Sequence, residues 1–514
     1  MKNNELVIRF EHISMQFPGV LANDDVSLEI RRGEVFALIG ENGAGKSTLM
    51  NILYGIQTPS SGAVYIKGRL VESYDPKNVI AQGVGMVHQH FMLVPSFTVA
   101  QNIVMSREPR KHRIFFDNAA AEEAARKLER EYGLTVPETE PVEDISVGLQ
   151  QRVEILKALY RGAEILILDE PTAVLTPQET EELFTVIRRI VREKGMTVII
   201  ITHKLDEVLA ISDRVGVMRK GKLVGIHETK DVDAAKLASL MVGRPVIFEE
   251  LERSGEPGEV ALRVERLNVS DARGLPAVRD LSLELRSGEI LGIAAIEGNG
   301  QSELIEAITG LTPIRSGRVT VLGRDVTGLD PGEIREAGLS HVPEDRLATG
   351  ISGLATVAEN LLMGKQREPR FNRFRFHQDR KAIRSYAQEL YERYDIRGAG
   401  VEGLGGDMSG GNMQKLVIAR EFSFNTPVLV ISQPTRGVDV GAIEFIHSRI
   451  MEKRNHGAAI LLASADLDEV FRLSDRIITL YEGQITGSFR AGEISKEEIG
   501  LYMTGSKRQG GQQR

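Results

Sequence analysis

Gly40-Glu41-Asn42-Gly43-Ala44-Gly45-Lys46-Ser47-Thr48 is the stretch that decides the fold of this 514-residue chain. Apolar residues precede it at 35–39 and follow it at 49–53, so the sequence predicts a strand, a glycine loop and a helix in that order. Glycines allow backbone N–H groups to turn toward phosphate oxygens, and a helix N-terminus adds positive potential. Lys46 can reach the β- and γ-phosphates, and the Ser47 hydroxyl can bind Mg²⁺. The flanking strand and helix favour a phosphate-binding loop over a glycine-rich turn without a ligand.

The composition limits the classes of protein to which the chain can belong. Hydrophobic residues make up 42% and charged residues 26%, as in ordinary globular proteins, and the length indicates at least two domains. Cysteine is absent, which excludes disulfides, thiolate metal sites and cysteine nucleophiles. A net charge of −8 argues against broad binding of nucleic acid. No apolar run is long enough for a membrane-spanning helix and no signal peptide opens the chain, so we expect any membrane role to be peripheral.

The chain contains an internal repeat with a period near 255 residues. Residues 27–34, SLEIRRGE, return at 282–289 as SLELRSGE. A period of this length indicates a duplicated domain rather than a solenoid. The sequence therefore predicts a first domain over 1–247, a polar linker with glycine and proline over 248–258, a second domain over 259–506 and a disordered tail over 507–514.

The pattern of apolar residues predicts an α/β fold in each copy. Continuous apolar runs at 165–168 and 197–201 are typical of parallel strands covered on both faces, with helix between them. Alternating segments at 6–10 and 63–67 predict further strands near the start of the first copy. The stretch 118–132 is rich in Ala, Glu, Lys and Arg and carries charge on most faces, which predicts a solvated surface helix.

Two acidic residues follow the apolar run at 165–168. Asp169, at the end of a buried strand, can hold Mg²⁺ beside a phosphate loop, and Glu170 can orient or deprotonate the attacking water. An apolar run that ends in Asp-Glu is weak evidence by itself. The phosphate loop upstream makes it a strong indication of nucleotide hydrolysis.

These motifs and their spacing resemble those of the ATP-binding-cassette (ABC) ATPases over nearly the whole chain. The resemblance implies two tandem P-loop ATPase domains, each with a mostly parallel sheet core, an antiparallel β subdomain and a helical subdomain. It also implies that Gln89 contacts Mg²⁺ and water and senses the partner permease, that His203 contacts the γ-phosphate, and that Phe17 stacks on adenine. The alternatives are a surface glutamine, a structural histidine and a core phenylalanine. His88 and His90 could pair on a metal ion, but the sequence offers no third ligand.

The second copy lacks most of these side chains. Aligned with the first copy, it replaces Lys46 by Gln301, Phe17 by Ala272, Gln89 by Glu344, Asp169 by Ser432, Glu170 by Gln433 and His203 by Ala465. The loop glycines Gly298 and Gly300 and the hydroxyl of Ser302 remain. We therefore expect the second copy to hydrolyse ATP poorly or not at all, although it could still bind nucleotide.

The signature motif of the family shows the opposite difference: the second copy resembles it and the first copy departs from it. Ser409-Gly410-Gly411 in the second copy resembles this signature, which grips the γ-phosphate held by the opposite cassette. In the first copy, Val147 takes the place of a glycine, and a β-branched residue restricts the backbone and obstructs the approach to phosphate. The D-loop shows the same split, with Asp439 in the second copy and Thr176 in the first.

Because ABC cassettes pair head to tail, the resemblance implies one composite site with all the competent parts and another with all the degenerate ones. The predicted hydrolytic site binds ATP through Phe17, Gly40, Glu41, Asn42, Gly43, Ala44, Gly45, Lys46, Ser47, Thr48, Ser409, Gly410, Gly411 and Asp439. Its predicted catalytic residues are Glu170, His203 and Gln89, and its predicted Mg²⁺ ligands are Ser47, Gln89 and Asp169. Independent decay would scatter the losses over both sites, whereas here they fall in one.

Fused double cassettes with a degenerate second half resemble the ATPases of bacterial importers. The stretches 87–94, 146–152 and 433–437 resemble the nucleoside branch most, and uptake of simple sugars such as ribose or galactose is the alternative. The resemblance implies permease subunits that contact the surface around Gln89 and residues 95–150, and an extracytoplasmic solute-binding protein that acts indirectly. It implies no nucleic-acid partner and a peripheral place on the cytoplasmic face of the bacterial inner membrane, with membrane contact only through the permease.

Two other classes of protein remain as distant alternatives. A soluble double-cassette factor acting on ribosomes or nucleic acid usually keeps both sites competent and carries a long charged linker, unlike this chain. A signalling or structural nucleotide-binding protein without turnover would not need Asp169, Glu170 and His203 together.

Overall fold

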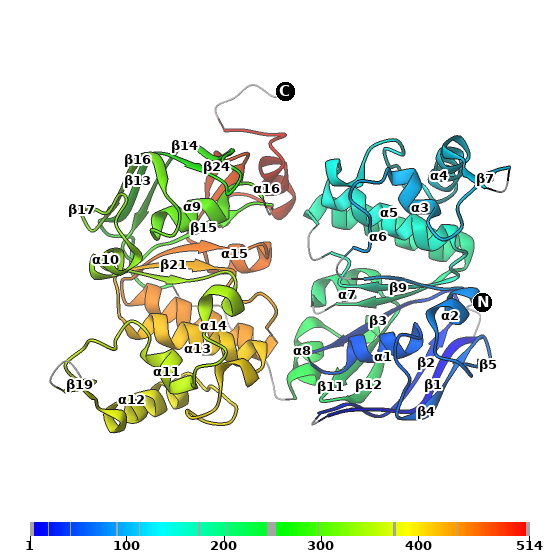
Figure 1. The fold of residues 1–514 in the computed structure, drawn as a ribbon, viewed down its shortest axis with the longest axis horizontal. Helices are drawn as coiled ribbons and strands as arrows, with labels where there is room; N and C mark the ends of the chain where they lie inside the picture. Colours follow the sequence, from blue (N-terminus) through cyan, green and yellow to red (C-terminus); the bar gives the residue numbers. More distant parts are fainter. Residues whose placement is uncertain are drawn as a thin grey trace. The chain divides into compact units, whose positions relative to one another are not determined.

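The computed structural model describes residues 5–509 except for 19, 42, 89–90, 113, 173–174, 203, 244–252, 297, 374–376 and 439. The chain divides into two compact units, Met1–Phe248 and Glu249–Arg514 (Figure 1). Each unit contains one copy of the repeat.

The first unit is built on a six-stranded sheet in the order β12-β11-β3-β10-β9-β6. Its strands are β3 (Val35–Gly40), β6 (Val84–Val87), β9 (Ile165–Asp169), β10 (Thr197–Ile201), β11 (Arg214–Arg219) and β12 (Lys222–Glu228). All neighbouring pairs are parallel except β11 and β12. Strands β3 and β10 are buried along their whole length, as expected for strands covered on both faces. The predicted parallel sheet is therefore confirmed.

Two further layers flank this sheet in the first unit (Figure 1). One is an antiparallel sheet in the order β2-β1-β4-β5, formed by β1 (Leu6–Phe17), β2 (Val20–Arg31), β4 (Ser61–Ile66) and β5 (Arg69–Leu70). The other is mostly helical and contains α3 (Val99–Val104), β7 (Arg110–Lys111), β8 (Phe115–Phe116), α4 (Asn118–Tyr132), η1 (Val142–Asp144) and α5 (Val147–Tyr160). The remaining helices are α1 (Lys46–Leu53), α2 (Pro76–Ala81), α6 (Pro177–Lys194), α7 (Leu205–Ile211), η2 (Thr229–Asp231) and α8 (Ala234–Val242).

Parallel pairing brings the ends of β3, β9 and β10 to one edge of the sheet. Ile201, at the end of β10, lies opposite both Asp169 of β9 and Leu38 of β3. The glycine loop, the acidic pair and the segment after Ile201 therefore leave the sheet together. Ligands of open α/β sheets bind outside this carboxyl-terminal edge.

Local sequence explains helix α4, which has the predicted bounds. The carboxylate of Asp117 caps the helix by accepting a hydrogen bond from the backbone N–H of Ala120. Gly133 ends it in the left-handed conformation with a φ of 71°. Ala121 and Ala125 form its buried face, and the other side chains are at least partly exposed. The predicted surface helix is confirmed.

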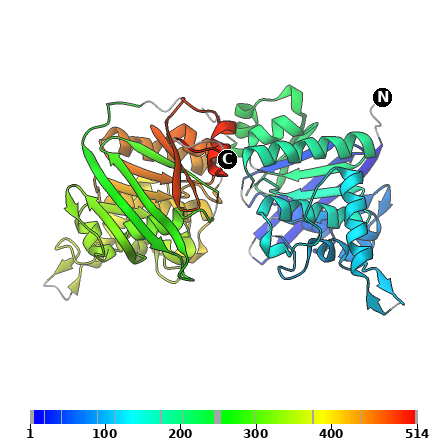
Figure 2. The same ribbon diagram turned by 90° about the horizontal axis from the view of Figure 1, so that it is seen from above.

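The second unit repeats this architecture, and its two longest strands, β13 and β14, are the long green pair in Figure 2. The antiparallel sheet, in the order β14-β13-β16-β17, contains β13 (Val260–Ser270), β14 (Pro276–Arg286), β16 (Ile314–Val321) and β17 (Arg324–Asp325). The six-stranded sheet, in the order β18-β21-β22-β15-β23-β24, contains β15 (Ile290–Ala294), β18 (Leu339–Val342), β21 (Val428–Ser432), β22 (Ala459–Ala463), β23 (Arg476–Tyr481) and β24 (Gln484–Arg490). A two-stranded sheet pairs β19 (Asn372–Arg373) with β20 (His377–Gln378).

The helices of the second unit follow the order of the first. They are α9 (Gln301–Ile308), α10 (Pro331–Glu336), the π-helix η3 (Arg346–Gly350), α11 (Val357–Leu362), α12 (Arg380–Arg393), η4 (Gly405–Asp407), α13 (Gly410–Ser423), α14 (Val440–Asn455), α15 (Leu467–Leu473) and α16 (Lys496–Met503). Both units thus have the predicted parallel core, antiparallel sheet and helical subdomain.

Two polar segments at the ends of the second unit form hydrogen bonds with the rest of that unit. The side chain of Arg253, within the predicted linker, donates to the carbonyl oxygens of Arg472 and Ser474 at 3.0 and 3.1 Å. In the predicted disordered tail, the backbone N–H of Gln509 donates to the carbonyl oxygen of Thr486 on β24 at 2.8 Å. Backbone pairing of this kind needs no apolar side chain, which is why the polar composition did not reveal it.

Helix α6 is 18 residues long, but charged residues occupy much of it. Across the described residues, no helix is both long and apolar enough to span a membrane.

Candidate active site

The glycine loop turns tightly between β3 and α1. Gly45, immediately before α1, has a φ of 94°, and a Cβ atom on it would lie 2.2 Å from the carbonyl oxygen of Ala22. Both the backbone conformation and the lack of space require glycine. The side-chain amide of Asn23 on β2 donates to the carbonyl oxygen of Gly45 at 3.1 Å, so the β1–β2 hairpin braces the loop.

The side chain of Lys46 is folded over the loop and is only 7% exposed. Its ammonium group donates to the carbonyl oxygens of Gly40 at 2.7 Å and Glu41 at 3.0 Å. Burial lowers the pKa of Lys46, although the carboxylates of Glu170 and Asp169 oppose this shift. An ammonium held here is positioned to pair with phosphate oxygens.

Asp169 ends β9 beside the loop and hydrogen-bonds with the hydroxyl of Ser47. Burial and the neighbouring Glu170 raise the pKa of Asp169 to about 6, while Lys46 and the hydrogen bond from Ser47 act in the opposite direction. The structure thus gathers four of the predicted site residues of the first copy at one edge of the sheet.

The oxygen atoms of Ser47 and Asp169 fit a Mg²⁺ ion. Mg²⁺ prefers hydroxyl, carboxylate and water oxygens, and the hydrogen bond between these two side chains shows that they can reach a shared ion. The raised pKa of Asp169 shows that nearby positive charge only partly offsets the cost of ionising this half-buried carboxylate, and a bound cation would offset the rest.

Glu170 has a backbone conformation that residues other than glycine rarely adopt. Its φ is 48°, and its backbone N–H donates to the carbonyl oxygen of Ile201 at 2.8 Å. Its counterpart Gln433 has a φ of 47°, and its N–H donates to the carbonyl oxygen of Ala463 at 2.7 Å. The conformation therefore belongs to the fold of both copies, and the chemistry depends on the side chain that occupies the position.

Not every predicted site residue can be placed. Asn42, Gln89, His203 and Asp439 lie outside the described residues. Phe17 ends β1 and is half-buried. The others occupy short segments: Gly43 and Ala44 complete the loop, Thr48 lies in the first turn of α1, and Ser409, Gly410 and Gly411 begin α13 in the second unit.

A polar cluster that the sequence did not single out flanks position 203. The hydroxyl of Thr172 lies 2.6 and 2.7 Å from the two carboxylate oxygens of Glu207. The ammonium of Lys204 pairs with Glu207 at 3.1 Å and donates to the carbonyl oxygen of Thr172 at 3.3 Å. These contacts tie the segment after β9 to α7. The two contacts of Thr172 join segments that are 35 and 32 positions apart, so no local motif marks them.

In the second copy, the corresponding polar groups bind to one another. The hydroxyl of Ser302 donates to Glu344 at 3.2 Å, and the same carboxylate accepts from Arg436 at 2.5 Å. The side-chain carbonyl of Gln433 accepts from the backbone N–H of Ala465 at 3.0 Å. The sequence showed the replacement by Glu344 but not its ion pair with Arg436, because the two residues are 92 positions apart.

The two signature-like helices begin beside side chains of opposite charge. In the first copy, a carboxylate oxygen of Glu179 lies 2.3 Å from the position of a Cβ on Gly148, near the start of α5. In the second copy, a guanidinium nitrogen of Arg346 lies 2.7 Å from the position of a Cβ on Gly410, the first residue of α13 and the counterpart of Val147. Positive charge at a helix N-terminus favours an anion there, and a carboxylate disfavours it.

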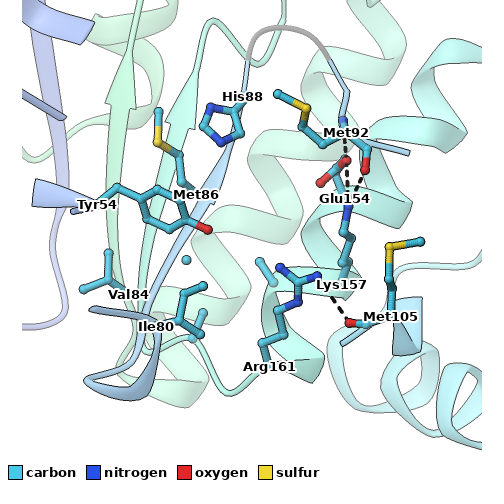
Figure 3. Close-up of a pocket in the computed structure, with 13 residues that line it drawn as sticks. Tyr54, Ile80, Val84, Met86, His88, Met92, Met105, Glu154, Lys157 and Arg161 are labelled. Carbon is cyan, nitrogen blue, oxygen red and sulfur yellow. Dashed lines mark hydrogen bonds and ion pairs between the residues drawn. The ribbon is translucent and has the colours of Figure 1, made fainter. Parts of the chain in front are cut away.

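A hollow of about 270 Å³ in the first unit lies against helix α5 (Figure 3). Its wall contains the buried ion pair of Glu154 and Lys157, with a distance of 3.2 Å. Glu154 accepts from the N–H of Met92 at 2.7 Å, and Lys157 donates to the carbonyl oxygen of Met92 at 2.6 Å. The segment at Met92 is therefore fixed to α5. Other lining residues include Tyr54, Met86, His88, Met105 and Arg161.

Comparison with known proteins identifies the family. The ABC transporter domain matches residues 23–173 and 278–436, once in each unit. The chain is 47% identical to the nucleoside import ATP-binding protein NupA of Lactococcus lactis subsp. cremoris, over 98% of this chain and 99% of that protein. It is 45% identical to the guanosine import ATP-binding protein NupO of Bacillus subtilis, over 98% of both chains. It is 44% identical to the glucose import ATP-binding protein TsgD13 of Haloferax volcanii, over 98% of this chain and 96% of that protein. With these relatives over nearly its whole length and two matched domains, the chain belongs to the ABC transporter family and carries its ATP-binding domain twice.

Proposed function

We propose that this chain is the ATPase subunit of a bacterial nucleoside importer. The observation that carries the proposal is the grouping of Lys46, Ser47, Asp169 and Glu170 at one edge of a parallel sheet. This set provides a phosphate-binding cation, two Mg²⁺ ligands and a base for water. The nucleoside class is supported by the relatives named for nucleoside and guanosine import, at 47% and 45% identity.

We infer that hydrolysis occurs at one composite site, between the phosphate loop of the first copy and the signature of the second. What supports this inference is the distribution of side chains. The first copy has Lys46 and Glu170 but Val147 in its signature, whereas the second copy has Gln301 and Gln433 but Gly410. Head-to-tail pairing would place every competent part around one ATP and every replaced part around the other.

In this composite site, each residue has a defined task. Lys46 neutralises charge on the β- and γ-phosphates, and Ser47 and Asp169 would hold the Mg²⁺ ion, which offsets further phosphate charge when bound. Glu170 orients a water molecule and accepts its proton as the water oxygen attacks the γ-phosphorus, and ADP leaves with the bridging oxygen. Ser409 and the N–H groups at the start of α13 stabilise the charge on the transferred phosphoryl group. Gln89 and His203 would complete the contacts to Mg²⁺, water and γ-phosphate.

The hollow beside α5 is the proposed contact for the permease. Methionines supply part of its wall, and methionine side chains adapt readily to a partner surface. Met92 is hydrogen-bonded to Glu154 and Lys157 of α5 and follows Gln89 by three residues. A movement of α5 would therefore also move the segment that carries Gln89. In this arrangement the subunit lies on the cytoplasmic face of the membrane, contacts it only through the permease, and receives solute information indirectly from an extracytoplasmic binding protein.

Uptake by the reconstituted complex tests the proposal. The chain is purified together with its membrane proteins, and the complex is inserted into liposomes. ATP is supplied on the side of the membrane on which the chain lies. We expect uptake of labelled guanosine that requires ATP and is lost in the Glu170→Gln variant. Guanosine uptake that persists undiminished in that variant would contradict the proposed role of Glu170.

Import of a simple sugar is the second candidate. The specific observation in its favour is the 44% identity to a protein named for glucose import, only slightly below the values for the nucleoside relatives. The same liposomes distinguish the two: ATP-dependent uptake of labelled glucose or ribose, without uptake of guanosine, would assign the sugar class instead.

A further inference from the structure

Ser409, at the start of α13, does not cap its helix. A serine at this position normally accepts a hydrogen bond from a backbone N–H of the first turn. The side chain of Ser409 makes no such bond, although its φ of −66° and ψ of 153° are those of an ordinary cap. Its hydroxyl oxygen instead accepts a hydrogen bond of 2.8 Å from the side-chain amide nitrogen of Asn412.

The orientation of the Asn412 amide is fixed by a second contact. The backbone N–H of Arg397 donates to the amide oxygen of Asn412 at 2.8 Å. A backbone N–H can only donate, so the oxygen of the amide must face Arg397 and the nitrogen must face Ser409. Because the oxygen of Ser409 accepts a hydrogen bond from Asn412, its own O–H can donate only to another acceptor.

The first copy shows the alternative arrangement. Leu149 stands where the second copy has Asn412, and its backbone N–H donates to the hydroxyl oxygen of Ser146 at 3.3 Å. Ser146 is therefore an ordinary helix cap, and its hydroxyl accepts a hydrogen bond from one of the N–H groups in the first turn of α5. In α13 the corresponding N–H group of Asn412 is not bonded to Ser409, so it remains available to an anion.

We propose that Asn412 is a positioning residue that holds Ser409 away from the cap, so that the serine hydroxyl and the N–H groups of α13 donate to the γ-phosphate. This inference rests on the composite site proposed above. It names the residue that orients Ser409 on the signature side of that site. In the first copy, Leu149 at this position would weaken phosphate binding by the signature, in addition to the effect of Val147.

A double-mutant cycle on the full chain tests the proposal. Mg²⁺-ATP hydrolysis is measured, together with the co-purifying membrane proteins, for Ser409→Ala, Asn412→Leu and the double variant. We expect kcat to fall about 100-fold for Ser409→Ala and about tenfold for Asn412→Leu. In the Ser409→Ala background, Asn412→Leu should change kcat less than about twofold, because a residue that acts only through Ser409 has nothing left to position.

Two further variants test the same contact. In Asn412→Asp the carboxylate can only accept a hydrogen bond from Ser409, and its charge also repels the γ-phosphate, so we expect a loss at least as large as for Asn412→Leu. Arg397→Ala keeps the backbone N–H and removes an exposed side chain with its surface ion pair to Asp395, so we expect activity within about twofold of the parent. Thermal unfolding of each variant confirms that it is folded.

The possible outcomes separate this inference from the proposed function. A large loss for Ser409→Ala with none for Asn412→Leu or Asn412→Asp would overturn the role of Asn412 and leave the composite site standing. An equal loss from Asn412→Leu in both backgrounds would make Asn412 structural and overturn the inference. No loss for Ser409→Ala would overturn the composite site itself.

Discussion

The two copies share a backbone and differ in the few side chains that do chemistry. Positions 170 and 433 have nearly the same φ and the same backbone hydrogen bond to the next strand, yet one is glutamate and the other glutamine. In the first copy the half-buried carboxylate of Asp169 lies beside Ser47, and in the second Ser302 bonds to Glu344, which pairs with Arg436. The difference teaches that apolar packing and strand pairing maintain this fold, while hydrolysis requires only a small set of polar groups at its edge.

The largest difference between the copies is expected at positions 170 and 433. Glu170→Gln removes the group that accepts the proton of water, so we expect kcat for ATP hydrolysis to fall at least about 100-fold while ATP binding persists. Gln433→Ala removes a neutral side chain that accepts a hydrogen bond from the N–H of Ala465, and we expect kcat to stay within about twofold of the parent. Hydrolysis assays and binding of a labelled ATP analogue measure both. Comparable losses from the two variants would show that the copies contribute equally.

The next largest difference concerns nucleotide affinity. Lys46→Ala removes the ammonium held over the loop, and we expect affinity for Mg²⁺-ATP at the first copy to fall about 100-fold, because charge-assisted contacts to phosphate contribute roughly 1.5–3 kcal/mol each. Gln301→Ala removes a neutral side chain from the second copy, so it should change the affinity of the first copy for Mg²⁺-ATP little. Titration calorimetry with the full chain compares them, and an equal effect of both changes would contradict the division of roles.

A moderate effect is expected from the half-buried carboxylate of Asp169. Its pKa in the fold is about 6, above the ordinary value of 3.8, so the folded state binds this proton more tightly than the unfolded state does. Ionisation of Asp169 therefore costs stability as the pH rises from about 4 to 6, and the cost is complete above that range. Asp169→Asn should raise the stability of the nucleotide-free chain by roughly 1–3 kcal/mol at pH 7.5 and by much less at pH 4.

The same pKa predicts the pH dependence of Mg²⁺ binding. Only the ionised carboxylate can hold the cation, so the affinity for Mg²⁺-ATP should decline as the pH falls below about 6. Ser432→Asn in the second copy replaces one neutral side chain by another and is the matched control. An affinity that is constant from pH 7.5 to 5 would contradict the role of Asp169 as a ligand.

The smallest effect is expected at the cap of α5. Ser146→Ala removes a helix cap in the first copy, so we expect a loss of about 1 kcal/mol in the free energy of unfolding of that unit. We expect hydrolysis to change little, since Ser146 belongs to the degenerate composite site. Denaturant unfolding and an activity assay on the same sample separate the two. A loss of hydrolysis without a loss of stability would contradict this account, because Ser146 would then act on the γ-phosphate as proposed for Ser409.

Much of the fold was predictable because it follows from local pattern. Continuous apolar runs predicted the parallel strands, and a capping aspartate and a terminal glycine define the helix predicted at 118–132. The pairing of the glycine loop with Asp169 was predictable because parallel strands end at one edge. The ion pair of Glu344 with Arg436 and the bond between Asn412 and Ser409 were not, because each depends on side-chain geometry that no spacing encodes.

The most direct test of unequal sites places an acid at the same point of both signature-like helices. Gly410→Asp and Val147→Asp each add a carboxylate to the first helical residue, at α13 and α5 respectively. ATP hydrolysis by the reconstituted complex should fall about 100-fold or more for Gly410→Asp, because the new charge repels the γ-phosphate. Val147 is exposed and an aspartate suits the start of a helix, so that variant should keep most of its activity. Equal loss from both variants, or loss from Val147→Asp alone, would contradict a single hydrolytic site formed by the phosphate loop of the first copy and the signature of the second.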